Sequence, residues 1–239
     1  MVRNFLPYLI AFVAVLLFAF GVIRGMEWIG SNPQHNPAAR FELAHLQGWA
    51  TQRKLRELVS DDDACFAAFD RAGAGYERRA PIGEGACRAS QRMILTSIAK
   101  VPSLAPAAVA PGCAVTAAMA LWNRDVVQPL AQRHFGQKVV RLATMGSYNC
   151  RKIAGRDAQS EHSTANAIDI SAFVLADGTR VSVLDDWDKG DAKGAFLHAV
   201  RDGACDLFST TLSPDYNRAH ADHFHLDMAV RTAGWSACR

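Results

Sequence analysis

The chain has 239 residues, of which 50% are hydrophobic and 21% are charged. This balance is typical of a globular protein and provides enough apolar surface for one domain with a hydrophobic core plus a short appendage. The 26 basic and 23 acidic residues leave a formal net charge of +3. Because this charge is small and evenly mixed, we expect no nucleic-acid partner.

The first predicted element is an apolar helix near the amino terminus. Residues 5–23 contain no charged side chain, and about 20 apolar residues cross a bilayer core as a helix. The run is longer than a signal-peptide core and lacks a clear small-x-small cleavage site after it. We therefore expect residues 1–30 to be a retained membrane anchor, with a cleaved signal or a buried soluble helix as alternatives. The polar, proline-containing residues 31–42 are predicted to tether it to a domain at 43–239.

The rest of the chain predicts helices first and strands later. Apolar spacing predicts a helix over 43–60, ended by the acidic triplet 61–63, which we expect to be a solvated turn. A second helix is predicted over 116–135, with a kink or a new first turn at Pro129. Residues 71–90 are expected to be irregular. Strands are predicted at 139–144, 167–175, 180–184 and 223–228, and a helix at about 192–202. This order predicts an α+β fold with a small antiparallel sheet and flanking helices.

Six cysteines follow the predicted anchor: Cys65, Cys87, Cys113, Cys150, Cys205 and Cys238. No two of them have the C-x-x-C spacing of zinc fingers or redox motifs. An even number of dispersed cysteines behind an export-like segment indicates disulfides in an oxidising compartment, with reduced cytosolic thiols as the alternative. Pairing of neighbours along the chain (65 with 87, 113 with 150, 205 with 238) is the working hypothesis.

Potential metal ligands are concentrated in two short segments, residues 160–170 and 220–227. Small residues between His162 and Asp169 permit a tight turn that brings the carboxylate beside the imidazole. In a strand, His223 and His225 point to the same face, because side-chain direction repeats every two residues. Two imidazoles and a carboxylate are the ligands of a catalytic zinc site, in which water occupies the fourth position.

A hydrolytic zinc site also needs a general base within hydrogen-bond distance of its water. The candidates beside His225 are His223 and Asp222. Strand geometry favours His223, because Asp222 points to the opposite face unless the strand starts or bulges there. His220 and Asp227 are expected to orient the ligand imidazoles. The choice of base stays open.

These motifs resemble those of a zinc peptidase superfamily. The pattern SxHxxxxAxD followed by HxH reads SEHSTANAID at 160–169 and HFH at 223–225. It is similar to that of the D-Ala-D-Ala metallocarboxypeptidases, the vancomycin-resistance dipeptidases, the lysostaphin-type endopeptidases and the Hedgehog signalling domain. More narrowly, from about Cys65 onward the chain resembles bacterial extensin-like C-terminal domains. The resemblance implies a Hedgehog/DD-peptidase-like fold.

The resemblance also implies roles for individual residues. His162, Asp169 and His225 would be the zinc ligands, and His223 would assist the water or the transition state. Asp222 stands three residues before the last ligand, where the dipeptidase and carboxypeptidase branches have an acidic base.

Two further positions are informative in the same comparison. Arg151, in the segment SYNCR, resembles the arginine that binds a substrate carboxylate or an oxyanion, tasks for which a guanidinium fork is suited. An ordinary surface arginine is the alternative. The relatives commonly have glycine where Ala165 or Asn166 stands.

Together these features predict a single-pass inner-membrane protein whose soluble domain lies in the periplasm. We expect a zinc metallopeptidase that hydrolyses peptidoglycan stem peptides or cross-links. The rival hypothesis is a zinc-stabilised module that binds cell-wall peptide or a protein partner without hydrolysis. The Hedgehog branch supports this rival, since it has the zinc ligands without established hydrolysis.

Overall fold

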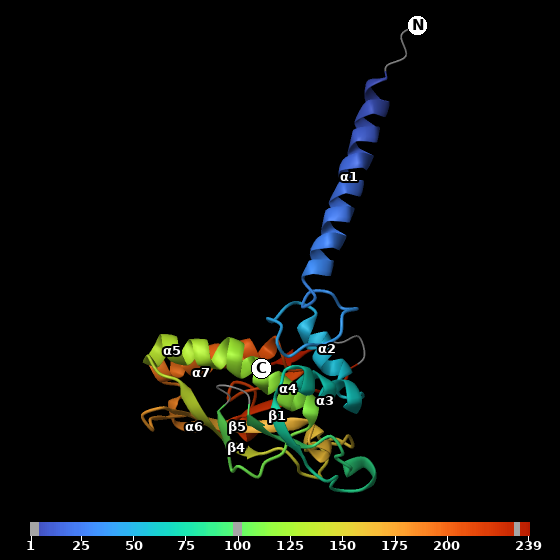
Figure 1. The fold of residues 1–239 in the computed structure, drawn as a ribbon. Coiled ribbons are helices and arrows are strands. Elements are labelled where there is room, and N and C mark those ends of the chain that lie inside the picture. Colours follow the sequence, from blue (N-terminus) through green and yellow to red (C-terminus); the bar gives the residue numbers. More distant parts are fainter. Residues whose placement is uncertain (1–4, 98–101, 232–234) are drawn as a thin grey trace.

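A computed structural model describes residues 5–97, 102–231 and 235–239. Helix α1 (Leu6–Ser31) stands apart from the rest of the chain, which forms a body of helices and strands at its foot (Figure 1). No residue of α1 is buried. The helix is long and apolar enough to cross a membrane, a property that an amino-terminal signal sequence shares. An apolar amino-terminal helix is therefore confirmed, and its retention as an anchor stays a prediction.

The body is built on a seven-stranded sheet with the order β3-β4-β5-β8-β7-β9, in which β6 also pairs with β5. The strands are β3 (Ser103–Ala105), β4 (Val139–Gly146), β5 (Ala167–Leu175), β6 (Arg180–Ser182), β7 (Thr210–Leu212), β8 (Phe224–Asp227) and β9 (Ala237–Cys238). The β3–β4 and β7–β9 pairs are parallel, whereas the other pairs are antiparallel. The α+β class is confirmed, but the sheet is larger than predicted. The three strands that the sequence did not predict, β3, β7 and β9, have only two or three residues each, too few for a periodic pattern to show in the sequence.

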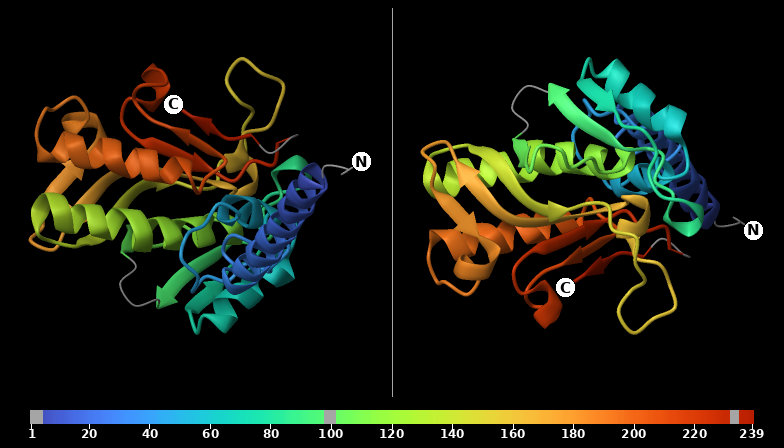
Figure 2. Two further views of the ribbon diagram at one scale, coloured as in Figure 1. Left: turned by 90° about the horizontal axis from the view of Figure 1, so that it is seen from above. Right: turned by 90° about the horizontal axis from the view of Figure 1, so that it is seen from below.

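Three helices cover one face of this sheet: α4 (Cys113–Trp122), α5 (Gln128–Phe135) and α7 (Ala192–Cys205) (Figures 1 and 2). Trp122 of α4 and Phe196 of α7 both pack on Phe173 of β5, with ring centroids 5.8 and 5.2 Å away. The Trp122 indole N–H donates to the Val200 carbonyl at 2.9 Å, so its one polar group is satisfied inside the core. The hydrophobic core thus lies between the helices and the sheet.

The predicted helix over 116–135 is divided. A π-helical segment, Asn123–Val127, separates α4 from α5, and Pro129 lies in the first turn of α5. A proline is tolerated there because the first-turn N–H groups have no intrahelical partner in any case. The prediction of a new first turn at Pro129 is confirmed.

Helix α2 (Thr51–Glu57) is much shorter than the helix predicted over 43–60. The chain turns at Gly48, whose backbone approaches the Gln34 carbonyl so closely that a Cβ would lie 2.6 Å from the oxygen. The Gly48 N–H donates to the Thr51 hydroxyl at 2.8 Å. This contact with a residue 14 positions earlier delays the start of the helix, although the local apolar pattern favours an earlier start.

The acidic triplet begins a helix that the sequence analysis missed, α3 (Asp62–Arg71). The Asp61 carboxylate accepts a hydrogen bond from the Ala64 N–H at 2.9 Å, which is the contact of an N-cap residue. The three aspartates are exposed, as expected, but they cap and begin a helix and do not form a turn. An acidic triplet fits either reading, because aspartate is favoured in turns and at helix starts alike.

A second small sheet contains β1 (Gly75–Arg78) and β2 (Met93–Ser97), which pair antiparallel. Strand β1 falls in the stretch predicted to be irregular. The Tyr76 ring packs on Phe66 and Phe69 of α3, with centroid distances of 5.6 and 5.9 Å. The strand therefore depends on a helix that the sequence analysis did not predict.

The cysteines form three disulfides: Cys65–Cys113, Cys87–Cys150 and Cys205–Cys238. The predicted pairing of Cys205 with Cys238 is confirmed, and the other two predicted pairs are wrong. Helix α3 packs on α4 and brings Cys65 to the first residue of that helix. The turn at Gly85–Cys87 (η1) lies beside the segment around residue 150. Tertiary packing, not sequence distance, sets the pairing.

Candidate metal centre

The pairing of β5 with β8 places two of the predicted ligands side by side. Asp169 and His225 are directly opposite each other in this antiparallel pair, and opposite side chains in such pairs lie about 4.5–5.5 Å apart at their Cβ atoms. Ile170 and Phe224 are also paired, and both are fully buried in the core. Because direction alternates along a strand, Asp169 and His225 point to the face of the sheet away from α4 and α7.

The third predicted ligand comes from the turn before β5. His162 lies in a short 3-10 helix, η3 (Glu161–Thr164), whose first backbone groups are capped by Ser160. Ala165 then takes a left-handed conformation with φ of 57°, and its carbonyl accepts from the Gly112 N–H at 2.8 Å. A left-handed alanine costs about 1–2 kcal/mol, and the reversal brings the chain from His162 into β5.

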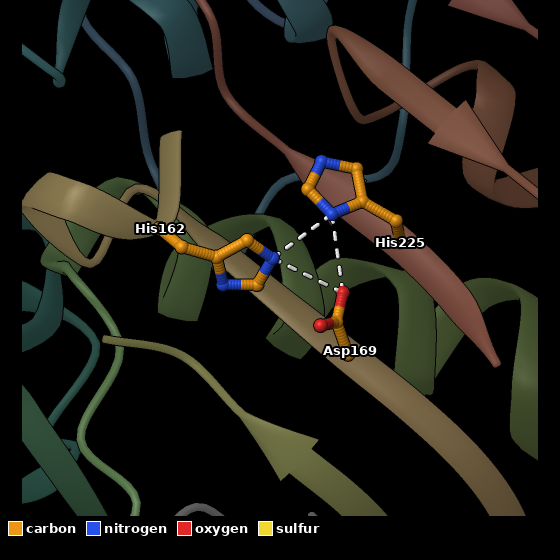
Figure 3. A group of neighbouring side chains, drawn as sticks. All are labelled: His162, Asp169 and His225. Carbon is orange, nitrogen blue, oxygen red and sulfur yellow. Dashed lines mark hydrogen bonds and ion pairs between the residues drawn. The ribbon is translucent and has the colours of Figure 1, made fainter. Parts of the chain in front are cut away.

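Three ligand atoms converge where these elements meet (Figure 3). His162 Nε2 lies 3.0 Å from His225 Nδ1 and 3.2 Å from Asp169 Oδ1. His225 Nδ1 and Asp169 Oδ1 are 3.1 Å apart. The structure therefore brings His162, Asp169 and His225 into one group of mutually adjacent donor atoms.

Hydrogen bonds on the far side of each imidazole determine which nitrogen faces this group. His162 Nδ1 lies 2.8 Å from the Ser147 carbonyl, which can only accept, so Nδ1 carries the proton. His225 Nε2 lies 3.0 Å from Asp227 Oδ2, and a carboxylate likewise accepts. In neutral rings the two inward nitrogens are then unprotonated, and three lone pairs converge. Asp227 thus holds the His225 ring from behind, which agrees with the orienting role predicted for this residue.

Converging lone pairs repel unless a cation lies between them. Without a metal ion, that cation is a proton. Burial lowers the pKa of His225, but hydrogen bonds with Asp169 and Asp227 outweigh it and raise the pKa to about 9. Burial opposes ionisation of Asp169, but the same kind of bonds with His162 and His225 hold its pKa far below the usual range. The three side chains thus favour a positive charge between them, either a proton or a metal ion.

The donor set fits zinc. Two imidazole nitrogens and one carboxylate oxygen are ligands that zinc prefers, with bonds of about 2.0–2.1 Å. In a tetrahedral site such bonds place neighbouring ligand atoms about 3.3 Å apart, close to the 3.0–3.2 Å between these three atoms. A cage for calcium or magnesium would instead present six or more oxygens.

His223 borders the group, and Asp222 lies behind it. His223 Nε2 is 3.7 Å from Asp169 Oδ1, and its Nδ1 is 2.7 Å from Asp222 Oδ1. The Asp222 side chain is 46% exposed, against 11% for that of His223. The histidine therefore faces the site, and the aspartate reaches the site through the histidine.

His220 lies at the rim rather than behind a ligand. Its ring centroid is 5.3 Å from that of His223 and 6.0 Å from that of His225. Its Nδ1 contacts Asn217 Oδ1 at 2.8 Å. Burial, with the neighbouring His223 and His225, lowers the pKa of His220 to about 4. His220 thus packs beside His223 and His225, and none of the described hydrogen bonds joins it to a predicted ligand, in contrast to the predicted orienting role.

Arg151 is exposed and joined to the site by its backbone. Its N–H and carbonyl both contact the Ser163 hydroxyl, at 3.1 and 2.8 Å. In the part of the chain that the structure describes, no hydrogen bond or ion pair reaches its guanidinium, while its charge contributes to lowering the pKa of His220. The guanidinium is therefore near the rim of the site and available to a ligand.

Sequence reasoning missed the partners that hold the loop before His162. The Ser147 carbonyl, a backbone atom, has no signature in the sequence. The Cys87–Cys150 disulfide and the hydrogen bond from Tyr148 Oη to the Cys87 carbonyl, 3.1 Å long, fix the same loop. The predicted pairing joined Cys87 to Cys65, so it gave no sign that Cys87 holds the loop around Cys150.

The site lies within a recognisable family segment. The family described as "Extensin-like protein C-terminus" matches residues 63–239. The chain belongs to this family. Comparison with curated proteins and with solved structures gives no match. Residues 63–239 contain all three predicted ligands, His223, and both cysteines of the disulfide that ties the loop carrying Arg151.

Proposed function

We propose that this extensin-like protein is a zinc metallopeptidase that hydrolyses peptidoglycan stem peptides or cross-links. We place it in the zinc peptidase superfamily that its motifs resemble, with a Hedgehog/DD-peptidase-like fold. His162, Asp169 and His225 hold the metal. The observation that carries the proposal is the convergence of their three inward lone pairs, with each imidazole fixed from behind.

An open coordination position is what links such a set to hydrolysis. Three protein ligands leave the fourth position of zinc to water, whose pKa falls to about 7, and bound zinc also polarises a carbonyl. A structural zinc site would have four protein ligands. The three-ligand set therefore favours chemistry over a purely structural metal.

His223 acts as the general base in this proposal. Its Nε2 faces the ligand group, and Asp222 accepts from Nδ1 and so keeps the Nε2 lone pair inward. An ionised Asp222 also stabilises the imidazolium that forms when His223 takes a proton. The two candidate bases thus act as one pair, in which the histidine moves the proton and the aspartate orients it.

Arg151 binds the carboxylate of the peptide substrate. Its exposed guanidinium has no described partner of its own, and its backbone is tied to η3 through Ser163. A guanidinium fork binds carboxylates bidentately. Stem peptides carry free carboxylates, so an arginine at the rim suits this substrate class.

The disulfides and α1 support a location outside the cytosol. Three disulfides indicate an oxidising compartment. With α1 retained, the domain is held by a single pass in the inner membrane and faces the periplasm. A tethered enzyme suits an insoluble wall substrate.

The test is digestion of purified muropeptides and sacculi by the full-length, zinc-loaded protein, with products identified by mass spectrometry. We expect new peptide termini that disappear in His225→Ala and in Asp169→Asn. His134→Ala is the matched control, since His134 lies on α5 and contacts Phe196 instead of the site.

Three outcomes separate the hypotheses. New termini with wild type and His134→Ala, but not with the ligand variants, support the proposal. Stoichiometric zinc in a protein that yields no new termini would show a zinc-stabilised binding module instead. Retention of full zinc content by both ligand variants would mean that the coordination set is wrong.

A further inference from the structure

The loops at the foot of α1 expose large apolar side chains. Leu46 is 71% and Trp49 is 70% exposed, and both precede α2 in the segment that surrounds the base of α1 (Figure 1). Trp28 and Met26, on the last turns of α1, are 50% and 69% exposed. We call these four residues the collar: Met26, Trp28, Leu46 and Trp49. The collar continues the apolar surface of α1 onto the domain.

Ring contacts join the two parts of the collar. His35 stacks on Trp28 at a centroid distance of 5.1 Å and lies 5.7 Å from Trp49. The backbone N–H of Trp49 also donates to His35 Nδ1 at 3.4 Å. Trp49 is therefore held close to the height of Trp28 along α1.

The segment after α1 is tied to the domain as well. The buried Lys54 side chain of α2 donates to the Pro33 carbonyl at 2.6 Å. Phe41 and Leu43 are buried in the core. The orientation of α1 relative to the domain is thus fixed by contacts on both sides of His35.

The length of α1 places the collar at the edge of a bilayer. The uncharged residues 5–23 rise about 28 Å as a helix, which matches a hydrocarbon core of about 30 Å. Trp28 follows about 7 Å beyond this run, inside a headgroup layer of about 5–8 Å on each side. Tryptophan is enriched at this level, because its ring is apolar and its N–H remains hydrated.

Three arginines around the collar form ion pairs with glutamates of the chain. Arg24, Arg40 and Arg53 form ion pairs with Glu27, Glu42 and Glu57 at 2.6, 2.5 and 3.0 Å. These arginines are largely exposed, so each pair contributes little to stability. The exposed side chains of the collar itself are apolar, so apolar contact is what this surface mainly offers to a membrane.

We propose that the collar docks into the headgroup layer of the membrane that α1 spans. Its partner is the lipid surface. Helices α4, α5 and α7 lie on the side from which α1 leaves, and the face of the sheet that carries the metal centre points the other way (Figure 1). Docking therefore holds the site facing away from the membrane at a fixed height. The inference rests on the proposed retention of α1 as a membrane anchor and does not depend on the proposed hydrolysis.

The experiment uses the full-length chain in nanodiscs of zwitterionic lipid. All six native cysteines are in disulfides, so a seventh introduced by Leu46→Cys can be labelled selectively with an environment-sensitive fluorophore. The matched control is Leu184→Cys, because Leu184 is 63% exposed on α6 (Val183–Asp186), away from α1 in Figure 1.

We expect the label at position 46 to be quenched by headgroup-spin-labelled lipid and the label at 184 not to be. Quenching by aqueous iodide should be roughly twofold weaker at 46 than at 184, since the interface excludes part of the water. Addition of anionic lipid should leave both values unchanged. Equal quenching at the two positions would overturn the proposal. Quenching at position 46 by headgroup-spin-labelled lipid that occurs only when anionic lipid is present would overturn it as well. So would recovery from cell membranes of a chain that begins after α1.

Discussion

Replacing Asp227 with asparagine tests how the ligand His225 is oriented. Asp227 is 4% exposed, and its two oxygens have different partners: Oδ2 faces His225 Nε2 and Oδ1 accepts from the Ala229 N–H, each at 3.0 Å. In Asp227→Asn one oxygen becomes an NH₂ group. If the amide keeps the Ala229 contact, its NH₂ opposes the His225 Nε2–H. The ring must then lose this bond or move its proton to Nδ1, where the metal lone pair is needed.

The expected magnitude follows from these contacts. Loss of an outer partner of a ligand imidazole weakens metal affinity about 10–100-fold, which corresponds to about 1.4–2.7 kcal/mol. The assay is titration of the metal-free, full-length protein with zinc against a competing chelator. Asp186→Asn is the matched control, because Asp186 is also buried and accepts from the Ser182 N–H and Lys189 Nζ, far from the ligands in the chain.

Both variants lose a buried carboxylate, so both are expected to lower the free energy of unfolding. Only Asp227→Asn is expected to weaken zinc binding. The reasoning is refuted if Asp227→Asn binds zinc as tightly as wild type, or if the two variants lose affinity equally.

Three further predictions concern the fold and the metal-free site. In the chelator-treated protein the pKa of His225 is raised from 6.5 to about 9. The stability that its protonated form contributes is therefore complete below about pH 6.5 and declines as pH rises toward 9. Urea denaturation at pH 6 and pH 9 measures this loss, and an unchanged or higher free energy of unfolding at pH 9 would contradict it. Replacing both Cys65 and Cys113 with serine removes a disulfide that closes a loop of 48 residues, and should lower the free energy of unfolding by about 4 kcal/mol. Non-reducing peptide mapping checks the pairing itself, and recovery of a peptide in which Cys65 is linked to Cys87 would disprove it. Asp61→Ala removes the N-cap of α3 and should cost about 1 kcal/mol in the same unfolding assay, whereas no loss would restore the view of a solvated turn.

Elements that are long and continuous in the sequence were predicted well. Strand β5 was predicted with the bounds that the structure shows, Ala167–Leu175, because Ile168 and Ile170 alternate with Asp169 and Ser171 and the apolar residues 172–175 follow directly. The apolar stretch of α1 was equally plain. In both cases the property that defines the element belongs to the segment itself.

Elements that depend on distant partners were not predicted. Strand β1 exists because Tyr76 packs on α3, and α2 begins late because Gly48 meets Gln34. The disulfides followed the packing of α3 on α4 instead of the order of cysteines along the chain. None of these partners is within the local window from which a pattern is read.

The candidate metal centre shows the same division. The sequence by itself determined which ligand atoms the site can offer, since two histidines and an aspartate stand in two short polar segments. Only the tertiary structure decided their geometry. The β5–β8 register sets Asp169 opposite His225, a left-handed Ala165 returns the chain from His162, and Ser147 and Asp227 select the inward nitrogens. Residue types are local information, whereas a coordination site is a set of distances between segments that only the folded chain brings together.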